Sequence, residues 1–116
     1  MNFSSPQGLE GRDRFSAYAA SKFGVRALTK CARFEVCVRV NAVIPGPTCT
    51  TMTQHRGWSE ADYSAAHGFC LLSRMAQPEE IAALCLFLSS DDASFCTPAD
   101  FVADGGLTAG KPRHPS

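Results

Sequence analysis

VCVRVNAVIPGP, residues 36–47, decides the fold of this 116-residue chain. Its β-branched run from Val36 to Ile44 predicts a short strand that is buried on both faces of a sheet. Pro45, Gly46 and Pro47 follow at once, and proline and glycine in such a cluster end a strand abruptly. The stretch therefore predicts a central strand whose carboxyl end opens directly into a loop.

Alternating elements flank this strand on both sides. Residues 1–5 read as the end of a buried strand, and apolar positions at helical spacing predict a helix over residues 16–34. These positions are Ala17, Ala20, Val25, Leu28 and Ala32. Pro78, followed by two glutamates, starts a helix that runs to residue 89 or 90, because proline and acidic residues suit a first turn. Residues 100–103 complete the pattern strand, helix, strand, helix, strand, which predicts an α/β fold with a parallel sheet.

Composition and charge exclude several kinds of partner. The chain is 45% hydrophobic and 19% charged, has a formal net charge of zero and is long enough for one domain only. No basic cluster appears, so we expect no nucleic acid and no anionic membrane surface as partner. No apolar stretch approaches the roughly 20 residues of a membrane-spanning helix, and residues 1–6 do not resemble a secretory signal. A cytoplasmic protein is the expectation.

Six cysteines raise the question of disulfides and of metal. They are Cys31, Cys37, Cys49, Cys70, Cys85 and Cys96. An even count is compatible with disulfides, but nothing in the sequence indicates an oxidising compartment. No pair has the two-residue separation of a zinc site. We expect free structural thiols and no metal.

Tyr18 and Lys22 are candidates for acid–base chemistry. A spacing of four residues on a helix places both side chains on one face, within reach of each other or of a shared ligand. A lysine ammonium beside a tyrosine hydroxyl stabilises the phenolate, so such a tyrosine exchanges a proton more readily at neutral pH. Most Tyr and Lys pairs at this spacing are ordinary surface neighbours, so the pair needs support from its surroundings.

That support comes from the ends of two predicted strands. Ser4 and Ser5 end the first strand, and Pro45 and Gly46 end the central one. Open α/β sheets bind ligands at the carboxyl ends of their strands. A serine hydroxyl, the helix that carries Tyr18 and a glycine backbone that admits a flat ring are thus expected to meet at one crevice.

The blocks that carry these features occur in the order seen in short-chain dehydrogenases/reductases, which the chain resembles from residue 2 to about 110. The blocks are residues 2–5 (NFSS), 18–22 (YAASK, a Tyr-x-x-x-Lys motif), 39–46 (RVNAVIPG), 78–82 (PEEIA), 87–94 (FLSSDDAS) and 104–106 (DGG). The resemblance implies a partial Rossmann-like, doubly wound parallel sheet. It also implies that residues 1–110 form the carboxyl-terminal half of such a domain, with residues 111–116 as a disordered tail.

The resemblance further implies an NAD(P)-dependent oxidoreductase that interconverts a secondary alcohol and a ketone. By position, Tyr18 is the general acid/base, Ser5 hydrogen-bonds the substrate oxygen, and Lys22 assists Tyr18 and holds the nicotinamide ribose. The nicotinamide ring would be bounded by Pro45 and Gly46, with Thr48 and Thr50 near its carboxamide.

The family's glycine-rich dinucleotide-binding turn does not occur in these 116 residues. That turn holds the cofactor pyrophosphate, and the acidic or basic residue by which the family selects NAD or NADP is missing with it. The two cofactors are therefore not distinguished, and unaided activity is not expected. The alternative is a truncated, inactive remnant that self-associates or pairs with a full-length homologue, since the family's subunits associate through the corresponding helices and a homo-oligomer is expected. A third alternative is a nucleotide-free binding module that uses the loop of residues 51–73.

Residues 51–73 resemble the family's mobile substrate loop, with a short helix over residues 59–67. Its larger side chains either line a pocket or pin the loop to the body, and the sequence leaves both possibilities open. They are Met52, Trp58, Tyr63, His67 and Phe69. His55 and His67 are expected to be solvated, since no other ligand is spaced to join them at a metal. The glycines of residues 104–106 are expected to form a structural turn.

Overall fold

The computed structural model describes residues 1–55, 57–67 and 70–110, and the predicted disordered tail lies outside them. The predicted order of strands and helices is present. The elements are β1 (Asn2–Phe3), η1 (Pro6–Gly8), α1 (Ser16–Glu35), β2 (Ala42–Pro45), α2 (Glu60–His67), α3 (Pro78–Ser89), η2 (Asp91–Ala93) and β3 (Asp100–Ala103), where η denotes a short 3-10 helix.

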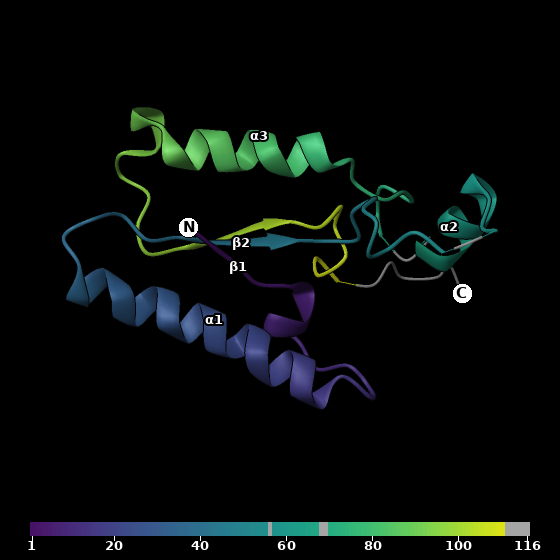
Figure 1. Cartoon of the computed structure of the whole chain (residues 1–116), viewed down its shortest axis with the longest axis horizontal. Coiled ribbons are helices and arrows are strands. Elements are labelled where there is room, and N and C mark those ends of the chain that lie inside the picture. The colour runs from purple at the N-terminus through teal and green to yellow at the C-terminus, as the bar shows by residue number, and fades with distance from the viewer. Residues whose placement is uncertain (56, 68–69, 111–116) are drawn as a thin grey trace.

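The three strands form one parallel sheet in the order β1-β2-β3. Ala42 of β2 pairs with Asn2 on one side and with Asp100 on the other. Helices α1 and α3 cover opposite faces of the sheet, and α2 lies beyond the carboxyl ends of β2 and β3 (Figure 1). The α/β, doubly wound arrangement expected from the sequence is thereby confirmed.

The central strand is shorter than predicted, because it begins at Ala42 and not at Val36. Val36 is the residue that ends α1, and Val38 is 62% exposed. Val40 and Asn41 hydrogen-bond to the loop before β3, through the Thr97 hydroxyl and the Cys96 carbonyl oxygen. A strand needs neighbours to pair with, and only from Ala42 onward do β1 and β3 both supply them.

The apolar core lies between the sheet and α3. Val43 packs there with Ile81 and Leu88 of α3 and with Ala93. Pro78 opens α3, and the Glu80 carboxylate accepts a hydrogen bond from the backbone N–H of Gln77, which closes its first turn. The helix is 12 residues long, and no helix in the described part of the chain is long and apolar enough to cross a membrane.

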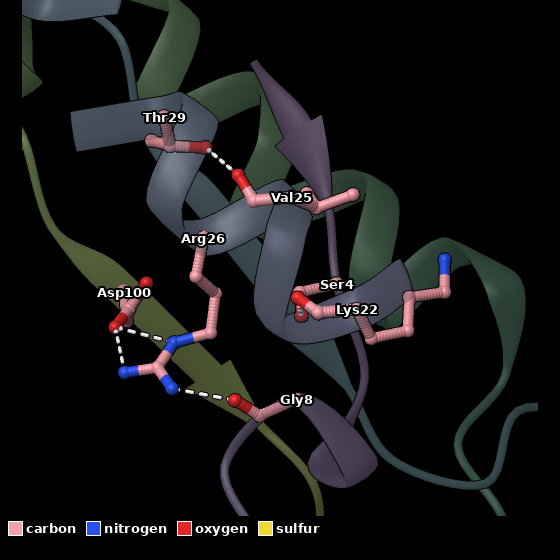
Figure 2. Close-up of polar contacts among 7 residues, drawn as sticks. All are labelled: Ser4, Gly8, Lys22, Val25, Arg26, Thr29 and Asp100. Carbon is pink, nitrogen blue, oxygen red and sulfur yellow. Dashed lines mark hydrogen bonds and ion pairs between the residues drawn. The ribbon is translucent and has the colours of Figure 1, made fainter. Parts of the chain in front are cut away.

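The face of α1 that meets the sheet carries polar residues that its apolar spacing did not predict, beside the half-buried Val25 and Ala32 that it did. Leu28, one of the positions that predicted the helix, is 67% exposed, whereas Thr29 is 1% exposed. The Thr29 hydroxyl donates to the carbonyl oxygen of Val25 and accepts a hydrogen bond from the Asn2 side chain. The Arg26 guanidinium donates to the Asp100 carboxylate of β3 (Figure 2). Hydrogen bonds and one ion pair therefore attach α1 to the sheet.

Candidate functional site

A cleft of about 670 Å³ opens at the carboxyl ends of β1 and β2. Its size is within the range of small-molecule sites. Seven of its lining residues are the candidates that the sequence singled out: Ser5, Tyr18, Lys22, Pro45, Gly46, Thr48 and Thr50. Parallel strands bring their carboxyl ends to one edge of a sheet, so residues far apart in the chain meet at this cleft.

Tyr18 and Lys22 lie on successive turns of α1 and face the cleft together. The Lys22 ammonium nitrogen lies 5.5 Å from the centre of the Tyr18 ring. It donates one hydrogen bond, of 3.3 Å, to the carbonyl oxygen of Phe3 at the end of β1. The Tyr18 ring is 42% exposed, and Phe15 packs edge-on against it at 6.0 Å between ring centres. The tyrosine is thus held from one side and open to a ligand on the other.

Ser5 reaches the cleft from the end of β1, where its side chain is buried. Its hydroxyl donates to the side-chain oxygen of Gln7 at 2.8 Å and accepts a hydrogen bond from the Gln7 backbone N–H at 3.3 Å. Ser5 is also the residue that caps η1. The short 3-10 helix η1 therefore fixes the position of the Ser5 hydroxyl at the cleft.

Pro45 and Gly46 form the wall at the end of β2. Pro45 is in register with Ala103 of β3, and the Gly46 N–H donates to the Ala103 carbonyl oxygen at 2.9 Å. A Cβ at Gly46 would lie 2.5 Å from the Asp104 Cα, so glycine is required here by the neighbouring strand end. The sequence suggested a ring as the reason for this glycine. The structure adds a second reason, which is the close approach of the Asp104 backbone.

Thr48 and Thr50 continue this wall in a loop that Thr53 organises. The Thr53 hydroxyl donates to the carbonyl oxygen of Thr48 at 2.6 Å and accepts from the backbone N–H of Thr50 at 2.9 Å. The Thr48 hydroxyl donates to the Gly46 carbonyl oxygen at 3.0 Å. Sequence reasoning missed Thr53, because a threonine in a loop is only a weak turn signal.

Asp104 directly follows β3, and its backbone lies beside Gly46 of the cleft wall. Burial of its carboxyl group favours the neutral form, but hydrogen bonds from the hydroxyl and backbone N–H of Thr108 and from the Gly106 N–H outweigh it and lower the pKa of Asp104. Gly105 and Gly106 adopt φ values of 63° and 84°. The turn after β3 thus has the structural character expected of it.

The loop of residues 51–73, which resembles the family's substrate loop, supplies an aromatic side of the cleft. Met52 and Trp58 line it, as does His55, which is exposed, as the sequence predicted. The rings of His55 and Trp58 lie 4.4 Å apart, and Tyr63 packs behind Trp58 at 5.1 Å. Trp58 therefore lines the cleft, one of the two possibilities that the sequence left open, whereas Tyr63 packs against Trp58 within the loop itself. The side chain of His67 and all of Phe69 lie outside the described residues.

Several lining residues carry no sequence signal of their own. They are Gln7, Arg12, Thr53, His55, Ala66 and Leu107. They come from turns and loops whose course depends on tertiary packing, so only their nearness to Ser5, Tyr18 or Thr50 in the chain hinted at them. Within the part of the chain that the structure describes, no three His, Cys, Asp or Glu side chains are placed to hold a metal ion. None of the six cysteines is in a disulfide.

The donors of the cleft fit the nicotinamide end of a dinucleotide. The Lys22 ammonium has three N–H groups, and only the bond to Phe3 is made within the described residues. The cleft that Lys22 lines, of about 670 Å³, has room for a ribose and a ring. Hydroxyl groups of Thr48 and Thr50 lie on the same wall as Gly46. Amide and hydroxyl groups of a ligand in the cleft could therefore hydrogen-bond to Lys22 on one side and to Thr48 and Thr50 on the other.

Comparison with known proteins points the same way. Residues 1–108 match the family model described as Enoyl-(Acyl carrier protein) reductase. Cyclopentanol dehydrogenase of Comamonas sp. (strain NCIMB 9872) is 43% identical over 112 residues, which are 94% of this chain and 45% of that protein. Trans-4-hydroxycyclohexanecarboxylate dehydrogenase of Sinomonas cyclohexanicum is 42% identical over 113 residues, 95% of this chain and 41% of that protein.

Solved structures agree with these sequence relatives. A structure of 4-hydroxyisoleucine dehydrogenase complexed with NADH superposes with a TM-score of 0.86 at 35% identity, over 95% of this chain and 46% of that one. The chain therefore spans about half the length of the curated relatives that it matches. With a family model matched over nearly all of its residues, the chain belongs to the short-chain dehydrogenase/reductase family.

Proposed function

We propose that this chain carries the catalytic and nicotinamide-binding part of an NAD(P)-dependent oxidoreductase that interconverts a secondary alcohol and a ketone. The observation that supports it is the meeting of Ser5, Tyr18 and Lys22 at one cleft, although they come from a strand end and from two turns of a helix. The matched relatives are named as dehydrogenases of alcohols. A small-molecule alcohol or ketone is therefore the proposed substrate class.

Each of the three side chains has a separate task. The Tyr18 hydroxyl, at the exposed side of its ring, takes the proton of the alcohol during oxidation and returns it during reduction. The Ser5 hydroxyl turns from Gln7 and donates a hydrogen bond to the substrate oxygen, which fixes the oxygen near Tyr18. The Lys22 ammonium, 5.5 Å from the Tyr18 ring centre, stabilises negative charge on the phenolate during the transfer.

The same cleft would hold the cofactor. Lys22 would donate to the ribose hydroxyls, Pro45 and Gly46 would bound one face of the nicotinamide, and Thr48 and Thr50 would bind its carboxamide. When bound, the nicotinamide supplies or accepts the hydride, and the protein contributes position and charge. The residues that would bind the adenosine end and select NAD or NADP are not among these five.

Because the chain is not expected to be active unaided, alcohol oxidation is tested in a chimera in which it replaces the matched part of cyclopentanol dehydrogenase of Comamonas sp.. Cyclopentanol is offered with NAD⁺ or NADP⁺, and formation of the reduced cofactor is followed by its absorbance. Tyr18→Phe is expected to lower the rate by about 100-fold or more, because acid–base catalysis by one group contributes about that factor. Tyr63→Phe changes the chain's other tyrosine, which packs on Trp58 behind the cleft, and is the matched control. Equal rates in the two variants would contradict the role of Tyr18.

A second candidate function is association with another copy or with a full-length relative, without catalysis. The specific observation is apolar surface: on α1, Leu28 is 67% and Phe34 is 89% exposed, and Phe3 of β1 is half exposed. Among the described strands β1 pairs only with β2. Sedimentation of the chain alone and with a full-length homologue tests this. A stable complex together with no turnover would favour association over catalysis.

A further inference from the structure

Arg12 gives the cleft a charge that the proposed reaction does not require. Of the residues that line the cleft, Arg12 and Lys22 are cationic and none is an aspartate or a glutamate. Lys22 is already assigned to Tyr18 and to the cofactor. A cleft lined by charges of one sign attracts ligands of the opposite sign, more strongly where apolar walls reduce screening.

We propose that the substrate is a secondary alcohol or ketone that carries a carboxylate, and that Arg12 binds this carboxylate. The inference rests on the proposed function for the identity of the reacting group. It adds a recognition site at the other end of the substrate. Guanidinium groups suit this task because their planar fork forms two parallel hydrogen bonds to a carboxylate.

The Arg12 guanidinium is available for a ligand. Its contact within the described structure is with the Phe15 ring, 5.1 Å from the ring centre. The acidic residue next to it, Asp13, is paired with Arg14 at 3.3 Å, and neither Asp13 nor Glu10 lines the cleft. Arg12 therefore faces the cleft without a carboxylate partner of its own among the described residues.

Phe15 contacts both Arg12 and the proposed acid/base Tyr18. Arg12 lies over Phe15, and the Phe15 ring packs edge-on against Tyr18 with 6.0 Å between centres at an angle of 80°. The phenylalanine thus connects the cation to the tyrosine at one side of the cleft. Met52 and Trp58 line the same cleft, so an apolar carbon skeleton between the carbinol and the carboxylate would contact apolar side chains.

Ligand binding can be measured without turnover, because Trp58 is the chain's only tryptophan and lines the cleft. Its fluorescence is titrated with trans-4-hydroxycyclohexanecarboxylate and with the corresponding neutral carboxamide, and calorimetry provides a second readout. We expect the acid to bind about tenfold more tightly than the carboxamide, the effect of one charge-assisted contact. Increasing salt is expected to reduce this preference.

Variants assign the preference to Arg12. Arg12→Gln is expected to abolish it, Arg12→Lys to keep part of it, and Arg14→Gln, a change outside the cleft, to leave it unchanged. Equal binding of acid and carboxamide to the unmodified chain, or an unchanged preference in Arg12→Gln, would overturn the proposal. No acid-dependent signal in either readout would overturn it as well.

The outcome is separable from that of the proposed function. An acid preference of the chain that depends on Arg12, together with no alcohol oxidation by the chimera, supports carboxylate recognition and contradicts the dehydrogenase role. Oxidation of cyclopentanol together with equal binding of acid and carboxamide does the reverse. The two measurements share no variant, since Tyr18 is changed in one and Arg12 in the other.

Discussion

The Ser4 hydroxyl donates a hydrogen bond of 2.8 Å to the backbone carbonyl oxygen of Lys22 (Figure 2). Ser4 is 5% exposed and directly precedes Ser5, while Lys22 lies one helical turn after Tyr18. The bond therefore attaches the end of β1 to the turn of α1 that carries the candidate acid–base pair. It sets the relative position of three proposed catalytic side chains through Ser4, which has no proposed part in the reaction.

Gly8 lies where the end of β1 and helix α1 approach each other closely. A Cβ at Gly8 would meet the Ser4 hydroxyl and would lie 2.9 Å from the Lys22 carbonyl oxygen. Backbone atoms of a helix cannot yield as a flexible side chain does, so we expect Gly8→Ala to lower the free energy of unfolding by about 1–3 kcal/mol. Urea unfolding followed by circular dichroism measures the change.

Gly24 provides the matched control on the same helix. It lies within α1, and a Cβ there would meet nothing within 4 Å. Alanine has the better helix propensity, so Gly24→Ala is expected to raise the free energy of unfolding by about 0.5–1 kcal/mol. If Gly8→Ala raised the free energy of unfolding, as Gly24→Ala is expected to do, the close packing at Gly8 would be contradicted.

The ion pair between Arg26 and Asp100 joins α1 to β3. Its closest atoms are 2.7 Å apart, and each side chain is 20% exposed. Arg26 also donates to the Gly8 carbonyl oxygen. Removing one partner of a largely buried pair leaves the other unpaired, so Arg26→Met is expected to cost about 2 kcal/mol of unfolding free energy.

A double-mutant cycle with Asp100→Asn isolates the pair. We expect the double variant to be about 1–2 kcal/mol more stable than the sum of the single losses implies. Arg14→Met, which removes an ion pair whose side chains are 90% and 89% exposed, is the control and should change stability by less than about 0.5 kcal/mol. Additive losses at Arg26 and Asp100 would show that the two groups do not interact.

Glu80 predicts a dependence of stability on pH. Hydrogen bonds from Arg74 and then from the Gln77 backbone N–H lower the pKa of Glu80 from 4.5 to about 2. A carboxyl group with a lower pKa in the folded state stabilises the fold above its unfolded pKa and loses that contribution as pH falls. The difference in Tm between the unmodified chain and Glu80→Gln should therefore be largest above pH 4.5 and shrink toward pH 2.

Glu79 separates this effect from the charge of the helix terminus. It lies in the same first turn of α3, whereas the ion pair with Arg74 is made by Glu80. Glu79→Gln keeps that pair and is expected to give a smaller, less pH-dependent change in Tm. Thermal scans across the acidic range compare the two variants. Identical profiles would mean that the contact with Arg74 contributes nothing.

Cysteine reactivity is expected to differ along the chain. Burial, and then the negative charge of Asp104, raise the pKa of the Cys70 thiol, and Cys70 is 2% exposed. Cys31 and Cys37 are exposed. Because the thiolate is the reactive form, iodoacetamide at mildly alkaline pH should label Cys31 and Cys37 first and Cys70 last. Peptide mass spectrometry follows the order, and in urea all six should react alike.

The local elements of this protein were predictable from its sequence because local signals specify them. Pro78 and the glutamates after it indicated the start of α3, and the Pro45–Gly46–Pro47 cluster indicated where β2 ends. The spacing of Tyr18 and Lys22 placed both on one helical face, which the structure turns toward the cleft. The family was predictable for the same reason: short ordered motifs carry it, and the comparisons confirm it.

Tertiary structure alone decided what these elements pack against. The apolar spacing of α1 suggested Leu28 as a contact position, but Thr29 and Arg26 face the sheet, because Asn2 and Asp100 offer hydrogen-bonding partners there. β2 begins at Ala42 and not at the predicted Val36 for a related reason, since a strand extends only where neighbouring strands pair with it. Arg12 reached the cleft through a loop without periodicity. The sequence determined which residues form helices and strands, whereas partners distant in the chain decided which faces are buried and which loop residues meet a ligand.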